Sequence, residues 1–160
     1  MTDKVEEDKI KKSYSILQKK YSLQSIEELE DNFGHLEFES EKYMLSSIRR
    51  RMTDKIEHFV SVLSNVFEGD AAIANIYESK VLDDEKKAEL FKSYRRLMKY
   101  SRQSNVLSLY YDEKGEAEFI KEFFKEWQSV KIELKEQLSA FRDSWDADTE
   151  ISDDILNYLG

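Results

Sequence analysis

Apolar residues recur at spacings of three and four along most of the chain, which is the period of an amphipathic α-helix. The longest run without a helix breaker extends from residue 36 to residue 68 and would bury one continuous seam, formed by Leu45, Ile48, Met52, Ile56, Phe59, Leu63 and Val66. A second run with the same spacing covers residues 117–145. The pattern therefore predicts two long helices, over residues 36–68 and 117–145.

Shorter helices are predicted before and between these two. Helical spacing over residues 6–21 and 71–79 predicts one helix in each range. Asp83 can cap a third helix, which continues to Arg102. These segments would pack against the two long helices.

Ser25 and Glu28 have the Ser-x-x-Glu spacing of a capping box, in which each side chain accepts a hydrogen bond from the other residue's backbone amide. Gly34 can end the helix that starts there, because glycine readily adopts a left-handed conformation. A short helix is therefore predicted between residues 25 and 34.

Residues 106–120 are open to two interpretations. The apolar and aromatic stretches 106–111 and 116–120 flank Gly115, a residue that favours turns. A helix followed by a turn is favoured. The alternative is a small hairpin near residues 106–120, with one strand in each stretch.

The composition supports an all-α helical bundle. The 160 residues include no proline, no cysteine and four glycines, where average usage is roughly 5% proline and 7% glycine. Residues 1–145 are predicted to form a single helical domain, and residues 146–160 an acidic tail. The sequence has neither a signal-peptide pattern nor an apolar run of membrane-spanning length, and it lacks cysteine, so we expect a cytoplasmic location.

The formal net charge of −9 is unevenly distributed. Residues 112–160 hold 14 acidic and 6 basic side chains, whereas residues 86–111 hold 7 basic side chains and one acidic. Five of these cations share one face of the predicted helix: Lys92, Arg95, Arg96, Lys99 and Arg102. Such a face can bind nucleic-acid phosphates, dock an acidic protein segment or remain solvated, and the sequence leaves all three interpretations open.

A second basic cluster, within the predicted helix 36–68, consists of Arg49, Arg50, Arg51 and Lys55. Three consecutive side chains cover most of a helix circumference, so at least one arginine must lie near the buried seam. That arginine needs a carboxylate partner, which another subunit can supply. Alternatively, its aliphatic stem lies along apolar surface while the guanidinium reaches water.

The acidic tail is also rich in apolar residues, which are Ile151, Ile155, Leu156, Tyr158 and Leu159. Ser152 can cap two helical turns within it. The apolar side of such a helix would dock on the body of the protein or on a partner.

No catalytic residue, cofactor or metal site is predicted. His35 and His58 lack the Glu-x-x-His spacing of a di-iron bundle. The acids Asp146, Asp148 and Glu150 are not followed by the glycine and glutamate of a calcium loop. The sequence contains no phosphate loop, nucleophile elbow or zinc-protease motif, which leaves a buried carboxylate pair as the enzymatic alternative.

The segment Met44–Phe59 resembles the arginine-rich central helix of the GINS replication subunits. The matching positions are Leu45, Ser46, Ser47, Arg50, Lys55, Ile56, Glu57 and Phe59. Leu82–Glu85 resembles the family's entry into its next helix. The resemblance implies a non-enzymatic subunit whose helical domain packs into a tetramer that links the replicative helicase to a nuclease-like partner. A small β domain usually accompanies that helical domain, and in this chain only a hairpin near residues 106–120 could correspond to it.

We therefore predict a non-catalytic helical assembly or adaptor subunit that acts through protein–protein contacts, in a homo- or hetero-oligomer and away from membranes. One alternative is a nucleic-acid-binding protein that uses the basic face of residues 92–102 and an autoinhibitory acidic tail. Another is a small helical enzyme with a buried carboxylate site.

Overall fold

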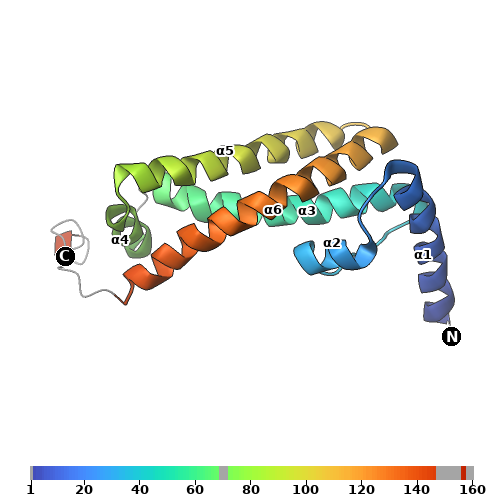
Figure 1. The fold of residues 1–160 in the computed structure, drawn as a ribbon, viewed down its shortest axis with the longest axis horizontal. Coiled ribbons are helices and arrows are strands. Elements are labelled where there is room, and N and C mark those ends of the chain that lie inside the picture. The colour runs from blue at the N-terminus through green and yellow to red at the C-terminus, as the bar shows by residue number, and fades with distance from the viewer. Residues whose placement is uncertain (1, 69–71, 147–155, 158–160) are drawn as a thin grey trace. The chain divides into compact units, whose positions relative to one another are not determined.

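The computed structural model describes residues 2–68, 72–146 and 156–157. These residues form helices joined by short connections, and no strand occurs among them (Figure 1). The helices are α1 (Thr2–Tyr21), α2 (Ile26–Phe33), the short 3-10 helix η1 (Glu41–Tyr43), α3 (Met44–Glu68), α4 (Ile73–Val81), α5 (Asp84–Leu107) and α6 (Glu113–Ser144). The predicted all-α fold is confirmed.

The chain divides into two compact units that draw on the same three long helices. Unit 1 comprises residues 1–57 and 99–126, and unit 2 comprises residues 58–98 and 127–160. Each unit contains one section of α3, α5 and α6 (Figure 1). Helices α1, α2 and η1 belong to unit 1, whereas α4 belongs to unit 2.

Aromatic rings fill the core of unit 1. The Phe123 ring is fully buried, and its centroid lies 5.1 Å from that of Tyr100, 5.9 Å from that of Phe33 and 6.0 Å from that of Phe119. These rings come from α2, α5 and α6. Their contacts therefore join elements distant in sequence.

The core of unit 2 is mainly aliphatic. Its most deeply buried apolar side chains include Leu63, Leu90, Leu97, Val130 and Leu134. The predicted seam of α3 is confirmed along both units, because six of its seven residues are buried and Phe59 is half-buried. The Phe59 ring packs 5.8 Å from that of Trp127.

The caps predicted at Ser25, Gly34 and Asp83 are present. The Glu28 amide donates to the Ser25 hydroxyl at 3.1 Å, and the Ser25 amide donates to the Glu28 carboxylate at 3.0 Å. Gly34 ends α2 with a φ of +87°. Asp83 accepts a 2.8 Å hydrogen bond from the Lys86 amide at the start of α5.

The predicted start of the first long helix, residue 36, is wrong: α3 begins at Met44. Residues 35–40 form a non-helical connection, and Leu36 is buried in it. The Leu36 amide donates to the Glu30 carboxylate at 2.9 Å, which satisfies the backbone without a helical turn. The lack of a helix breaker did not make these residues helical.

The hairpin alternative for residues 106–120 is also wrong. Residues 106–107 complete α5, residues 108–112 form the connection, and α6 begins at Glu113, four residues before the predicted start. The Glu116 amide donates to the Asp112 carbonyl at 2.8 Å, so the helical ladder already includes Gly115. Other helix boundaries differ from the predicted ones as well: α1 starts at Thr2, α4 covers Ile73–Val81, and α5 continues past Arg102 to Leu107.

Most of the acidic tail lies outside the described residues, including Ile151, Ser152, Ile155, Tyr158 and Leu159. Leu156 is helical and half-exposed. Within the described ranges, every helix is too short or too polar to cross a membrane.

Candidate protein-docking sites

Arg49 is the buried arginine of the central basic cluster. Its Nε donates to a carboxylate oxygen of Glu116 at 2.7 Å, and its Nη1 donates to the Ser104 hydroxyl at 2.8 Å. The Ser46 hydroxyl donates to the other Glu116 oxygen at 2.9 Å. The predicted carboxylate partner therefore belongs to the same chain, and the network ties α3, α5 and α6 together inside unit 1.

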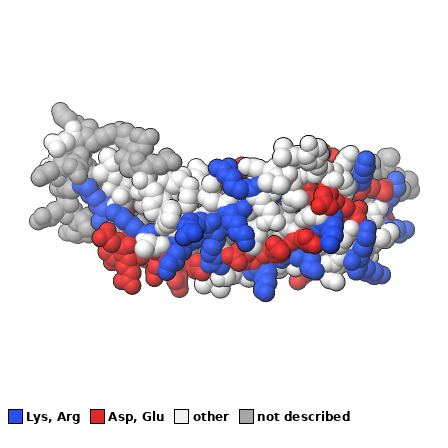
Figure 2. Space-filling view, turned by 90° about the horizontal axis from the view of Figure 1, so that it is seen from above, with Lys and Arg blue, Asp and Glu red and all other residues white. Residues whose placement is uncertain are grey.

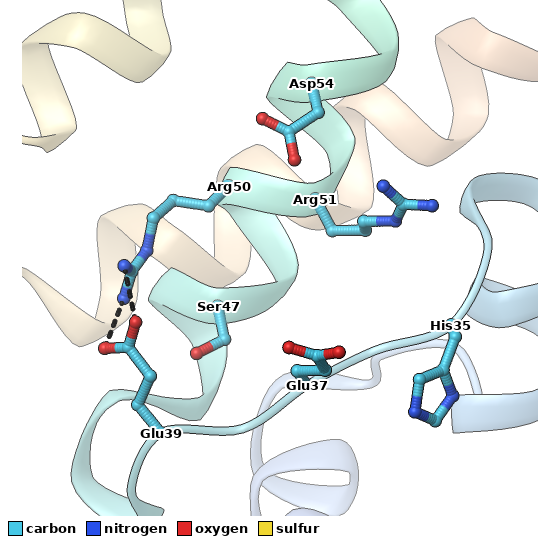
Figure 3. A pocket seen from close by; sticks show the side chains of 7 residues that line it. All are labelled: His35, Glu37, Glu39, Ser47, Arg50, Arg51 and Asp54. Carbon is cyan, nitrogen blue, oxygen red and sulfur yellow. Dashed lines mark hydrogen bonds and ion pairs between the residues drawn. The ribbon is translucent and has the colours of Figure 1, made fainter.

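Arg50 and Arg51 line an open pocket of about 530 Å³ in unit 1 (Figure 3). The other lining residues are His35, Glu37, Glu39, Ser47 and Asp54. Arg50 donates two hydrogen bonds to the Glu39 carboxylate, at 3.0 and 3.1 Å. Arg51 extends from α3 toward the segment that holds His35 and has no hydrogen-bond or ion-pair partner among the described residues. The pocket thus holds the Arg51 guanidinium, unpaired within the described part of the chain, beside carboxylates.

The mixed lining indicates which ligands the pocket can accept. Three carboxylates outnumber two guanidinium groups, so a polyanionic phosphate backbone would meet repulsion there. A single carboxylate or a charged side chain of another protein can instead pair with Arg51. The pocket is therefore not the uniformly basic surface that suits a nucleic-acid backbone.

Because Gly34 has no side chain, the Arg51 guanidinium can occupy the space next to it. A Cβ atom at position 34 would clash with Arg51 Nη2, and the backbone there, with φ +87° and ψ 178°, is a conformation that only glycine adopts readily. We expect Gly34→Ala to destabilise the protein by about 1–3 kcal/mol in chemical unfolding.

A second variant separates the two causes of that loss. Gly34→Ala combined with Arg51→Ala removes the clash but keeps the backbone strain, so it should recover only part of the stability. Wild-type stability of the Gly34→Ala protein would contradict the assigned backbone conformation.

Two of the five cations on the predicted basic face of α5 make contacts within the chain. Arg96 donates to the Glu133 carboxylate at 2.6 Å and to the Ser129 hydroxyl at 3.1 Å, whereas Lys99 lies over the Tyr100 ring. The remaining three cations are exposed and have no ion-pair partner among the described residues: Lys92, Arg95 and Arg102. Lys55 is half-buried on α3. Figure 2 shows Lys and Arg side chains interspersed with Asp and Glu rather than forming a continuous basic surface.

The Arg96–Glu133 pair gives a pH-dependent contribution to stability. Burial alone would raise the pKa of Glu133, but hydrogen bonds from Arg96 and Ser93 bring that pKa below its ordinary value of 4.5. The stabilising contribution is complete above the unfolded-state pKa and is lost as the pH falls through the lower folded-state pKa.

We therefore expect Glu133→Gln to unfold with a shallower pH dependence than the wild type below about pH 4.5. Thermal unfolding at a series of pH values measures this difference. Glu136→Gln, on an exposed side of the same helix, is the control and should keep the wild-type profile. If the wild type and Glu133→Gln unfolded with the same pH dependence, the stabilising role of the Arg96–Glu133 pair would be contradicted.

Large apolar side chains are exposed where α5 passes into α6. Leu109 is 70% and Tyr110 83% exposed, and the neighbouring Val106 and Tyr111 are also exposed. The Tyr111 ring packs edge-on against that of exposed Tyr43, 5.1 Å away. We call these five residues, all in unit 1, the turn patch.

Each histidine has a contact of its own in the structure. His35 Nδ1 lies 2.9 Å from Glu30, and the His58 ring contacts Phe59. Across the described ranges, no group of three His, Cys, Asp or Glu residues could hold a metal ion.

Sequence reasoning missed Glu116 and the turn patch. Glu116 had a detectable signal, since it lies four residues before Ile120 in the apolar seam of α6. The turn patch had a weaker sequence signal, which was an apolar stretch whose residues do not follow the spacing of a helix.

No protein-family model matches the chain, and no curated protein or solved structure is significantly similar to it.

Proposed function

We propose that the chain is a non-catalytic helical assembly subunit that associates with a second copy of itself through the turn patch. The observation that carries this proposal is the exposure of Leu109, Tyr110 and their neighbours. Exposed clusters of large apolar residues are typical of interaction sites, and tyrosine is enriched at interface centres. Burial of these side chains against another protein would remove them from water.

The charges around the turn patch favour a second copy as the partner. Arg102 and Lys42 are exposed cations of unit 1, whereas Asp112 is an exposed carboxylate next to Tyr111. In a two-fold interface, residue i of one copy contacts residue j of the other copy and j contacts i, so a rim of both signs can place the cations of each copy against the carboxylate of the other. The apolar centre would supply affinity and the rim would set orientation.

Single cysteines test this interface, because the chain has none of its own. Ser108→Cys lies within the connection that carries the turn patch and keeps its apolar side chains. Treatment with a short bismaleimide should give covalent dimers of Ser108→Cys. Ser61→Cys, exposed on α3, is the matched control and should give no covalent dimer. Equal yields from the two variants, or none from Ser108→Cys, would contradict the proposal.

A GINS-like role in DNA replication is the more specific form of the proposal. It is supported by the resemblance of Met44–Phe59, which here belongs to one helix with Leu45 and Ile56 buried and Arg50 at the surface. The test is co-purification with the replicative helicase. We expect Arg50→Ala to lose this co-purification and Arg142→Ala to keep it.

We also propose a cytoplasmic location, which the absence of cysteine supports.

Nucleic-acid binding is the second candidate, favoured by Lys92, Arg95 and Arg102, which are exposed and have no ion-pair partner within residues 2–68, 72–146 and 156–157. It predicts affinity for a labelled DNA duplex that falls steeply between about 50 and 200 mM salt. Lys92→Glu should abolish that binding, whereas Lys121→Glu, exposed on α6, should not. Absence of binding at low salt would remove this candidate.

A buried carboxylate site, the enzymatic alternative, would centre on Glu116. Both of its oxygens accept hydrogen bonds, one from Arg49 and one from Ser46. This arrangement suits a structural ion pair, so we propose a structural and not a catalytic role for Glu116.

A further inference from the structure

Unit 2 has an exposed aromatic surface of its own, formed by α3 and α5. Phe67 is 39% and Phe91 46% exposed, with ring centroids 5.6 Å apart. The half-buried Tyr94 ring lies 5.9 Å from each of them. Three clustered rings, two of them open to solvent, indicate a surface that another apolar segment can cover.

Two cations flank this aromatic cluster. Lys87, Phe91 and Arg95 follow one another at spacings of four residues on α5, so they lie along one side of the helix. Neither the Lys87 nor the Arg95 side chain has a hydrogen-bond or ion-pair partner in the described part of the chain. We call Phe67, Lys87, Phe91, Tyr94 and Arg95 the aromatic–basic row.

The acidic tail has the complementary chemistry. Residues 146–160 contain five carboxylates and no lysine or arginine, and they contain the five apolar residues Ile151, Ile155, Leu156, Tyr158 and Leu159. Apolar side chains can cover the rings while the carboxylates pair with Lys87 and Arg95. The turn patch, by contrast, offers an apolar surface with a rim of both signs.

The tail starts within unit 2. The Trp145 ring packs 4.5 Å from that of Tyr77, its Nε1 donates to Glu78 at 2.8 Å, and the Tyr77 hydroxyl donates to the Ser144 carbonyl at 2.7 Å. These contacts anchor the last residues before the tail to α4. A tether of fifteen residues spans up to about 50 Å when extended, whereas the section Asp84–Met98 of α5 is roughly 22 Å long.

We propose that residues 146–160 bind the aromatic–basic row of the same chain. The covalent tether gives the tail a high effective concentration at this surface, so the contact forms without a second molecule. A separate protein segment that is acidic and apolar would compete for the same row. This proposal concerns unit 2 and does not depend on self-association through the turn patch.

A nitroxide label on the full-length chain tests the proposal. Asn157→Cys supplies a single attachment site, because the natural chain has no cysteine. In the ¹⁵N-labelled protein we expect paramagnetic broadening of the amide signals of residues 87–95. The combined change Lys87→Glu and Arg95→Glu should abolish that broadening. Lys121→Glu with Lys125→Glu, which alters the net charge equally at exposed positions of α6, should keep it.

A mixed sample separates binding within one chain from binding between chains. When the nitroxide is on unlabelled protein and the ¹⁵N label on protein without nitroxide, we expect no broadening of residues 87–95. Broadening in that mixture would overturn binding within the chain and indicate a second copy as the occupant. Two further results would overturn the proposal. One is the absence of broadening in the chain that carries both the nitroxide and the ¹⁵N label. The other is broadening that persists after both charge reversals, Lys87→Glu and Arg95→Glu.

Discussion

Replacing Glu116 with alanine is expected to lower the free energy of unfolding by about 3–5 kcal/mol, because Arg49 would remain as an unpaired charge in the interior. Both side chains of the pair are almost completely buried. Removing one partner therefore leaves the other neither hydrated nor neutralised. Urea unfolding measures the loss directly.

Two further variants assign that loss to the ion pair. Glu118→Ala removes an exposed carboxylate two residues away and is expected to change stability by less than about 0.5 kcal/mol. Arg49→Met combined with Glu116→Leu replaces both charges by apolar side chains and should recover most of the lost stability. A Glu116→Ala protein as stable as the wild type would contradict the buried pair.

Phe123→Ala is expected to destabilise the protein by about 3–5 kcal/mol, because it removes a fully buried ring and leaves a cavity among Phe33, Tyr100 and Phe119. The contacts of this ring join three helices, so its surroundings cannot easily collapse into the space. Chemical unfolding monitored by circular dichroism measures the effect.

Phe91→Ala is the matched control for Phe123→Ala. The same atoms are removed, but the Phe91 ring is nearly half exposed and its loss creates no enclosed cavity. Its destabilisation should therefore be much smaller. Equal losses for the two variants would mean that the core of unit 1 is not centred on Phe123.

The helices were predictable because apolar periodicity and local capping act within a few residues. The seam of α3 and the capping box at Ser25 required only spacing and side-chain type, and both are present. The start of α3 was not predictable in this way. There the buried Leu36 and its hydrogen bond to Glu30 stabilise an irregular connection.

The candidate sites were less predictable, because they depend on residues distant in sequence. The arginine cluster indicated that one arginine would be buried, but the partner, Glu116, lies 67 residues away among 34 acids. The same cluster gave no sign that Arg50 would pair with Glu39 from the connection before α3. The turn patch depended on an α5–α6 connection whose conformation the sequence left open.

The molar mass in solution tests the proposed assembly most directly. Light scattering across a concentration series, at low and high salt, should give twice the 19.0 kDa of a single chain as the concentration rises. Leu109→Ser with Tyr110→Ser should return the mass to 19.0 kDa, whereas Ile16→Ser, which alters a side chain as exposed as Leu109, should leave the dimer intact. A mass of 19.0 kDa for the wild type at every concentration and both salt levels would contradict self-association through the turn patch.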